Sequence, residues 1–255
     1  PQMQLVLSGM HTASVSGASG DGPRPLTIPN INRGALTLDG KWLAYMDETG
    51  LNIVDTTGGK SILLAGIQGY GPRWSPDGQR IAYIGTGSEA GLFMTDRYGT
   101  APLRLSDLGY ESIAGWSPDG SRLYFAVPDA TNQGFMLRVV DISTTRAIDQ
   151  FILENSSRKA PLPAVSPDGK WVAYRASNNS SLYLKGMDGS PARLLLDKPA
   201  MAVTGLVWEK ESHLLGVSLI STSDSHDQTL LIQPDNCETY RLPYIHGELN
   251  GIYIP

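Results

Sequence analysis

The sequence predicts an all-β protein, a six-bladed β-propeller built from four-stranded antiparallel blades. Three observations lead to this prediction. A five-residue pattern returns about every forty residues, each copy is followed by short β-rich runs, and the two chain ends supply complementary parts of one more copy. Glycine and proline make up 28 and 17 of the 255 residues. Many of them occupy the turns of these copies, so their excess over the usual composition reflects repeated turns.

The repeated pattern is Trp-Ser-Pro-Asp-Gly. It begins at Trp74 and at Trp116, and a third copy has Val165 in place of the Trp. A weaker copy at 36–40 keeps the Asp-Gly, and a degenerate fifth copy places Trp208 at the Trp position. The aligned glycines at 40, 78, 120 and 169 give repeats of 38, 42 and 49 residues. Propeller blades have this period, whereas the runs between the copies are too short and too β-branched or aromatic for helical repeats.

Each repeat contains four short strands, and the first of them ends at the pattern itself. The second follows the Asp-Gly turn and is predicted at 42–45, 81–84, 123–126 and 171–174, and in the degenerate copy at 213–217. The third is predicted at 51–54, 92–94, 136–140 and 182–184, and a glycine turn then leads to a fourth strand such as 193–196. β-Branched and aromatic residues favour strands at these places.

The Ser-Pro-Asp-Gly segment is predicted to form the turn between the first and second strands. Pro76 presets φ for a type I turn, Asp77 is suited to accept hydrogen bonds from nearby backbone N–H groups, and Gly78 tolerates the positive φ that follows. The Trp before the turn is expected to wedge between neighbouring blades. Alanine recurs in the second strands, where it allows sheets to pack closely, at positions 44, 82 and 173.

Carboxylates recur in ways that raise the question of a metal site. One aspartate stands at the same position of four repeats, namely Asp39, Asp77, Asp119 and Asp168. These residues belong to separate blades, so we expect them to be too far apart to share an ion. The segment 224–227 (Asp-Ser-His-Asp) offers three metal ligands in four residues, but a polar loop between the second and third strands of the fifth repeat is the favoured interpretation. We predict neither a metal nor a cofactor.

The two ends of the chain complete the propeller. Residues 251–255 align with a first strand, residues 4–8 with a second strand, and residues 21–27 with the turn and fourth strand of the other repeats. Residues 1–30 and 244–255 are therefore predicted to form one closing blade, in a single domain spanning 1–255. Such a closure would remove the open sheet edges that otherwise promote aggregation.

The Trp-Ser-Pro-Asp-Gly copies, together with second strands such as Ile81-Ala82-Tyr83, resemble the repeat of TolB-type β-propellers. Similar repeats occur in the propellers of tricorn protease and of prolyl oligopeptidase and dipeptidyl peptidase enzymes. The resemblance covers essentially the whole chain, and it implies the fold and an extracytoplasmic location, periplasmic or secreted. These 255 residues include neither the α/β domain of TolB nor the hydrolase domain of the peptidases, so the resemblance leaves the activity open.

Composition and missing motifs exclude several classes of function. The net charge of −5 and the scattered basic residues argue against nucleic-acid binding. The apolar runs are far shorter than the roughly 20 residues of a membrane span. The single Cys237 excludes an intramolecular disulfide framework, and we expect it to be a buried thiol. The sequence has no Gly-x-Ser-x-Gly or His-Glu-x-x-His, so no catalytic motif supports an enzyme.

The candidate site follows from the architecture. In a propeller, the loops that enter the first strands surround one mouth of the central channel, and we call this predicted surface the rim. Tyrosine and arginine, which dominate binding hot spots, occur there together. A polar and aromatic rim without a binding role is the competing interpretation. The predicted rim residues are Arg33, Tyr70, Arg73, Tyr110, Glu111, Arg158, Lys159, His246, Glu248 and Asn250.

The resulting prediction is a noncatalytic recognition module, present as a monomer, that binds a protein or peptide partner at the rim. Two alternatives stay open. One is a lyase or hydrolase acting on a sugar or a peptide, with Glu111, His246 and Glu248 as acid and base candidates. The other is the propeller domain of a larger peptidase.

Overall fold

The structure is a computed structural model of the chain. It describes residues 4–9, 12–16, 24–26, 34–37, 39–56, 60–100, 102–107, 112–131, 134–156, 161–209, 213–224, 226–241 and 248–253. For residues 4–9, 12–16, 24–26, 227 and 248–253 the description is limited to the backbone. Predictions that fall elsewhere lie outside the described residues.

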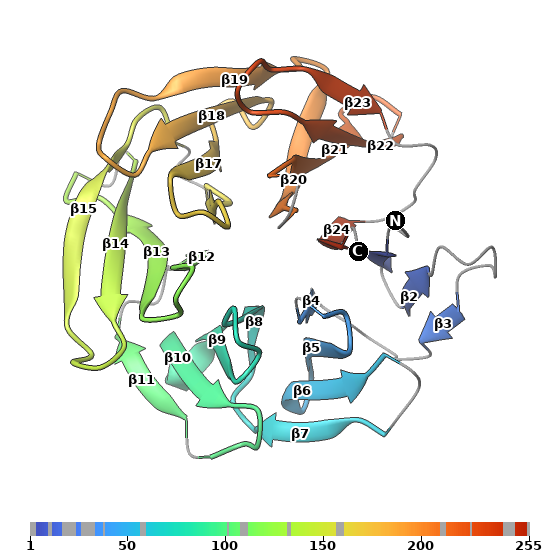
Figure 1. Cartoon of the computed structure of the whole chain (residues 1–255), viewed down its shortest axis with the longest axis vertical. Coiled ribbons are helices and arrows are strands. Elements are labelled where there is room, and N and C mark those ends of the chain that lie inside the picture. Colours follow the sequence, from blue (N-terminus) through green and yellow to red (C-terminus); the bar gives the residue numbers. More distant parts are fainter. Residues whose placement is uncertain are drawn as a thin grey trace. The chain divides into compact units, whose positions relative to one another are not determined.

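The strands form six four-stranded sheets, which we call the first to fifth blades and the closing blade (Figure 1). The first blade contains β4 (Gly34–Leu36), β5 (Trp42–Asp47), β6 (Gly50–Asp55) and β7 (Ile62–Ala65). The second contains β8 (Gly69–Trp74), β9 (Arg80–Gly85), β10 (Gly91–Asp96) and β11 (Leu103–Ser106). The third contains β12 (Ser112–Trp116), β13 (Arg122–Pro128), β14 (Phe135–Asp141) and β15 (Ala147–Leu153).

The remaining blades follow the same order. The fourth contains β16 (Ala164–Val165), β17 (Trp171–Arg175), β18 (Ser181–Gly186) and β19 (Arg193–Asp197). The fifth contains β20 (Met201–Trp208), β21 (Leu215–Ser221), β22 (Asp227–Ile232) and β23 (Thr239–Arg241). The closing blade has the order β24 (Glu248–Tyr253), β1 (Gln4–Gly9), β2 (Thr12–Ser16) and β3 (Arg24–Leu26). The predicted closure, one C-terminal strand beside three N-terminal strands, is confirmed.

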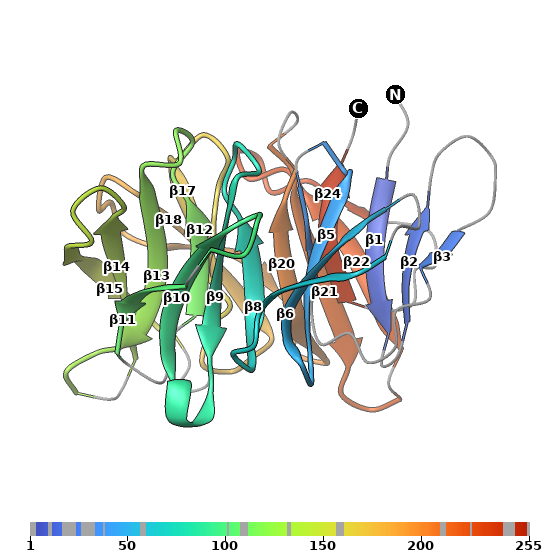
Figure 2. The same cartoon turned by 90° about the horizontal axis from the view of Figure 1, so that it is seen from below.

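The chain divides into two compact units. One comprises residues 1–109 and 250–255, and the other comprises residues 110–249. Inside the first unit, β8 packs against β4 and β5 of the preceding blade; inside the second, β16 packs against β12, and β20 against β16. At these three junctions the blades therefore meet through their first strands. Figure 2 shows the first strands β8, β12 and β20 from the side. The single-domain prediction for 1–255 stays a prediction.

The predicted four-strand repeat is confirmed, with one local difference. The second strands β5, β9, β13 and β17 contain all the residues predicted for them. In the fifth blade, β21 begins at Leu215, two residues later than predicted. The reason is His213, whose φ of 54° is left-handed and incompatible with a strand.

The core consists of apolar clusters between neighbouring blades. One joins the first and second blades, one the third and fourth, and one the fourth and fifth. Ala44, Ala82 and Ala173 are fully buried, which confirms that alanine in the second strands lets the sheets approach closely. The adjacent second-strand tyrosines Tyr83 and Tyr174 are buried as well, and each stacks on an aromatic ring of the third strand.

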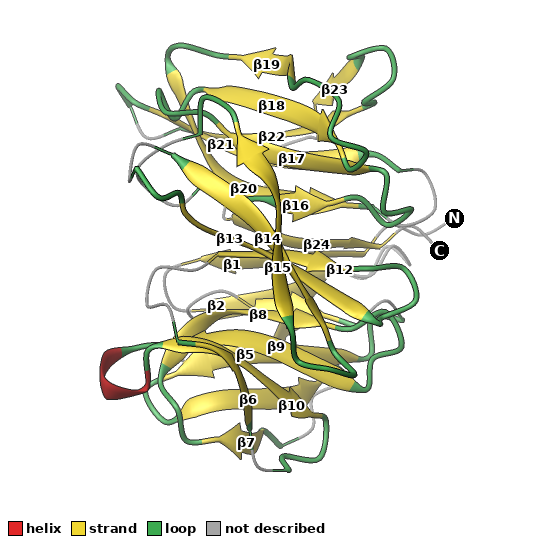
Figure 3. Ribbon diagram, turned by 90° about the vertical axis from the view of Figure 1, so that its left-hand side faces the viewer, coloured by secondary structure: helices red, strands yellow, loops and turns green. Residues whose placement is uncertain are grey.

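The pairing of the fourth strands with the third strands is irregular in several blades. A register shift separates the third and fourth strands in each of the first four blades. Bulges of this kind twist an outer edge and discourage pairing with another chain. The helical structure in the described part of the chain is one 3₁₀ turn, Gly87–Glu89, between β9 and β10, drawn in red in Figure 3. None of the described helices is long and apolar enough to span a membrane.

Cys237 differs from the prediction. It is exposed and lies in the turn between β22 and β23, with a φ of 58°. A guanidinium N–H of Arg193 donates to its Sγ at 3.5 Å. The expectation of a buried thiol was wrong because the residue occupies a left-handed turn position, which lies at the surface.

Candidate functional site

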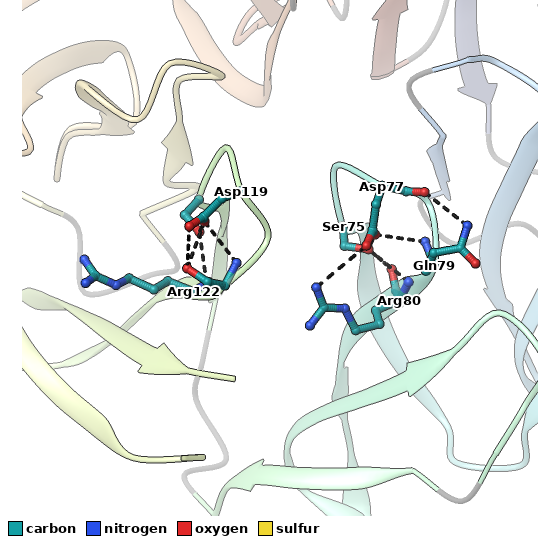
Figure 4. Close-up of polar contacts among 8 residues, drawn as sticks. Ser75, Asp77, Gln79, Arg80, Asp119 and Arg122 are labelled. Carbon is teal, nitrogen blue, oxygen red and sulfur yellow. Dashed lines mark hydrogen bonds and ion pairs between the residues drawn. The ribbon is translucent and has the colours of Figure 1, made fainter. Parts of the chain in front are cut away.

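The repeated turn is a small hydrogen-bond network centred on a serine, and Figure 4 shows its copy in the second blade. The Ser75 hydroxyl donates to Asp77 Oδ1 at 2.5 Å and accepts the Arg80 N–H at 2.9 Å. Asp77 Oδ1 also accepts the Gln79 N–H at 3.1 Å, and the Gly78 N–H donates to the Ser75 carbonyl at 2.9 Å. With a φ of 64°, Gly78 takes the left-handed position that the sequence predicts for it.

The same network recurs in three other blades, with Thr37 and Asp39, Ser117 and Asp119, and Ser166 and Asp168 as its hydroxyl and carboxylate. The Ser75 hydroxyl lowers the pKa of Asp77, and the Ser117 hydroxyl with the donors of Ser121 lowers the pKa of Asp119 to about 2. Each of these carboxylates therefore accepts hydrogen bonds from donors of its own turn. In the described part of the chain, no group of three His, Cys, Asp or Glu residues is arranged to hold a metal ion.

The Trp of the pattern ties its blade to the preceding one. Trp74 Nε1 donates to the Ala35 carbonyl in the first blade at 3.0 Å, and Trp208 Nε1 donates to the Ala164 carbonyl in the fourth blade at 2.9 Å. The predicted wedge between blades is confirmed at these two junctions. Because Val165 occupies this position in the fourth blade, it has no indole N–H to offer.

Two predicted rim residues, Tyr70 and Arg73, are described with their side chains, and both belong to β8. Tyr70 pairs with Ile84, whereas Arg73 pairs with Ala82, so β8 has one extra residue between them. The bulge contains Gly71, whose φ is 65°, and Pro72. Proline has no backbone N–H for strand pairing, and a bulge is a place in a strand where this is tolerated. Both side chains are half-buried. The Arg73 Nη1 donates to the Pro72 carbonyl at 3.0 Å.

The start of β8 is closely held. A side-chain carbon on Gly69 would lie 1.9 Å from the Ile84 carbonyl oxygen, so this position accepts only glycine. Gln68, just before the strand, donates from Nε2 to the Glu48 carbonyl at 3.0 Å, and its own carbonyl accepts the Thr86 N–H at 2.9 Å. The turn after β5, the connection into β8 and the turn after β9 are thereby joined beside Tyr70.

The other predicted rim residues are not brought together by the described part of the structure. Arg33, Tyr110, Glu111, Arg158, Lys159 and His246 lie outside the described residues. Glu248 and Asn250 belong to β24, of which the backbone is described. Their roles stay predictions.

Two features escaped the sequence reasoning. The Arg97 guanidinium lies 5.1 Å from the Trp42 ring centroid and 5.7 Å from that of Tyr98, whose side chain is 79% exposed. Lys185, buried between the third and fourth blades, forms an ion pair with Glu154 at 2.7 Å. The signal available for this ion pair was Lys185 itself, a lysine within a β-rich run that is otherwise apolar.

Asp224 and His226 lie between β21 and β22, as the polar-loop interpretation predicts, and Asp227 begins β22. His226 Nδ1 lies 3.0 Å from Asp224 Oδ2. The Ser221 hydroxyl and the His226 N–H lower the pKa of Asp224.

Comparison with solved structures shows the fold. TolB from Acinetobacter baumannii superposes with a TM-score of 0.75 at 15% identity, covering 98% of this chain and 66% of that chain. A chain from a nidogen–laminin complex gives a TM-score of 0.74 at 10% identity, covering 98% of this chain and 97% of that one. Oligogalacturonate lyase from Vibrio parahaemolyticus gives 0.63 at 12% identity, covering 86% and 71%. The chain therefore has the β-propeller fold seen in TolB.

At the level of sequence, no family model matches the chain. A relative from Bacillus subtilis (strain 168), the uncharacterized peptidase YuxL, is 31% identical over 140 residues. The match covers 42% of this chain and 21% of the relative, so the chain spans about a fifth of the relative's length.

Proposed function

We propose that the protein is a noncatalytic recognition module and that it binds a protein or peptide partner at a surface containing Tyr70 and Arg73. The carrying observation is Arg73, which takes a position that is small or apolar in the other described blades and follows a bulge in β8. The first strands β12 and β20 contain bulges as well, so the arginine, and not the bulge, is particular to the second blade. Tyrosine and arginine are also the residue types that most often contribute large binding energies.

Arg73 stands out among its equivalents. The residue before the Trp position is Ala35 in the first blade, Gly115 in the third, Ala164 in the fourth and Val207 in the fifth. Four blades fold with a small or apolar residue there, so the fold does not require an arginine in the second blade. A role specific to this blade, such as contact with a partner, accounts for the exception.

The surroundings of Tyr70 and Arg73 favour binding with little reorganisation. Gly69 packs closely against the backbone of β9. The hydrogen bonds of Gln68 connect the turn after β5, the segment before β8 and the turn after β9. At the other end of β8, the Trp74 indole donates to the first blade. A strand held in this way loses little backbone conformational entropy when a partner binds. The likeness to TolB supports an extracytoplasmic location, and we propose that the module acts as a monomer.

The test is affinity capture followed by titration. The wild-type protein, immobilised, captures its partner from an extract of the cells that produce it, and the purified partner is then titrated calorimetrically against variants. The double variant Tyr70→Ala/Arg73→Ala should bind at least a hundredfold more weakly, given about 2 kcal/mol or more per hot-spot residue.

The matched control is Arg97→Ala/Tyr98→Ala, which removes the same residue types from the turn after β10 of the same blade. Its affinity should equal that of the wild type. Unchanged binding by the Tyr70→Ala/Arg73→Ala variant, or an equal loss in the control, would contradict the proposed surface.

The likeness to oligogalacturonate lyase and the match to a peptidase favour a second candidate function, an enzyme acting on a sugar or a peptide. Glu111, His246 and Glu248 are then the acid and base candidates. Incubation with oligogalacturonate and with a peptide mixture, followed by mass spectrometry of the products, separates this from the first proposal. Turnover that His246→Ala or Glu248→Gln abolishes would replace the recognition module with an enzyme.

A further inference from the structure

The second unit contains two junctions between blades, and they are built differently. Between the fourth and fifth blades, Trp208 Nε1 donates across the junction to the Ala164 carbonyl. Between the third and fourth blades, the equivalent residue is Val165, and a side-chain carbon on Gly115 of the third blade would lie 3.5 Å from its Cβ. The first strands at this junction meet by apolar contact, without the indole hydrogen bond.

The junction between the third and fourth blades contains an ion pair between Lys185 and Glu154 instead. Lys185, in β18 of the fourth blade, has a side chain that is 3% exposed. Its Nζ lies 2.7 Å from Oε1 of Glu154, the residue that follows β15 of the third blade, and 5.1 Å from the Phe151 ring centroid. The Glu154 side chain is 46% exposed, so water reaches the carboxylate while the ammonium is enclosed.

The backbone links across this junction gather around the same carboxylate. The Tyr174 hydroxyl donates to the Glu154 carbonyl at 2.9 Å, and the Ser177 N–H donates to the Asn155 carbonyl at 2.8 Å. Ser156 forms an isolated antiparallel bridge with Ala176 of the fourth blade, and its Oγ accepts the Phe135 N–H within the third blade at 2.9 Å. The polar ties of the junction are therefore concentrated at the segment that leaves β15, next to Lys185.

We propose that the junction between the third and fourth blades is a conformational joint, latched by the Lys185–Glu154 ion pair. When the carboxylate is removed, an enclosed ammonium is left without its counter-charge, a strongly unfavourable state. When the junction opens, water solvates the Lys185 ammonium. No indole hydrogen bond between the first strands has to break for this to happen. Each blade keeps its own strand ladder, so the two blades separate locally while the junction between the fourth and fifth blades stays closed.

Native-state hydrogen exchange, read residue by residue by NMR, tests the joint without any partner. The amide of Ser177, which donates from the fourth blade to the Asn155 carbonyl of the third, reports on it. The amide of Val203, which donates from the fifth blade to the Asn179 carbonyl of the fourth, reports on the junction between the fourth and fifth blades. In Glu154→Gln, exchange at Ser177 should rise about tenfold, while exchange at Val203 stays at the wild-type rate.

A second variant separates the latch from a general loss of stability. Adding Lys185→Met to Glu154→Gln removes the enclosed charge and keeps a side chain of similar length, so exchange at Ser177 should return to the wild-type rate. Unchanged exchange in Glu154→Gln would overturn the proposal. So would equal acceleration at both junctions, or failure of Lys185→Met to restore slow exchange.

Discussion

The serine of the repeated turn should be more important to stability than its size suggests, and Ser75→Ala tests this. The Ser75 side chain is enclosed, with the residue 1% exposed, and its hydroxyl has two partners. It accepts the Arg80 N–H at 2.9 Å and donates to Asp77 Oδ1 at 2.5 Å. The alanine variant leaves a partly buried N–H without this acceptor and removes one donor from a carboxylate. Together these losses amount to about 2 to 3 kcal/mol.

Thermal unfolding followed by circular dichroism measures the effect, and in a chain of this length about 2 kcal/mol corresponds to a fall in Tm of about 4 to 8 °C. Ser88→Ala is the matched control, because Ser88 is exposed in the 3₁₀ turn of the same blade. A Tm for Ser75→Ala within 1 °C of the Ser88→Ala value would refute the assigned role of the hydroxyl.

The same variant should change how stability depends on pH. The Ser75 hydroxyl lowers the pKa of Asp77 in the folded state below the ordinary value of 3.8. A lowered carboxylate pKa stabilises the fold above the unfolded-state pKa, and this contribution disappears as pH falls through the folded-state pKa. The stability difference between wild type and Ser75→Ala should therefore be larger at pH 6 than at pH 2.

Three further substitutions test the polar groups of buried aromatic side chains. Trp74→Phe should lower the free energy of unfolding by about 1 kcal/mol, measured by urea denaturation, because the indole N–H no longer reaches the Ala35 carbonyl; stability equal to wild type would show that the bond contributes nothing. Tyr83→Phe should leave stability unchanged or raise it, since the buried Tyr83 hydroxyl has no hydrogen-bond partner among the described residues. Tyr174→Phe should cost about 1 kcal/mol, because its hydroxyl donates to the Glu154 carbonyl; equal effects of the two tyrosine substitutions would contradict this distinction.

The strands and turns were predictable because each depends on a local pattern that the chain repeats. Pro76 restricts φ at the turn, Gly78 permits the positive φ that follows, and the β-rich runs on either side leave little choice of element. Comparing the copies with one another also located the closing blade, since the pieces at the two ends match different strands of the other repeats. The late start of β21 was missed because a left-handed His213 has no signature of its own.

The contacts between repeats were less predictable, since they depend on residues far apart in the sequence. The serine of the pattern is visible in three copies, and Thr37 takes its position in the first, but the place of Ser75 between Asp77 and the Arg80 N–H appears only when the turn closes. The ion pair of Lys185 with Glu154 joins residues from different blades, and neither position is part of the repeated pattern. The exposed Cys237 was misjudged because burial was inferred from residue type, whereas the turn conformation placed it at the surface.

A repeat protein separates the residues that make the fold from those that give one blade a property of its own. A feature that recurs in several blades, such as the hydroxyl–carboxylate turn of the first four, is explained by folding and says nothing about function. The informative positions are those where one copy departs from the others while the backbone stays the same. Arg73 departs from small or apolar equivalents on a strand that is otherwise tightly held, and Val165 departs from tryptophan at a junction that instead has an enclosed ion pair. Other copies fold with the common residue at each position, and on this ground we propose binding at the first and local opening at the second.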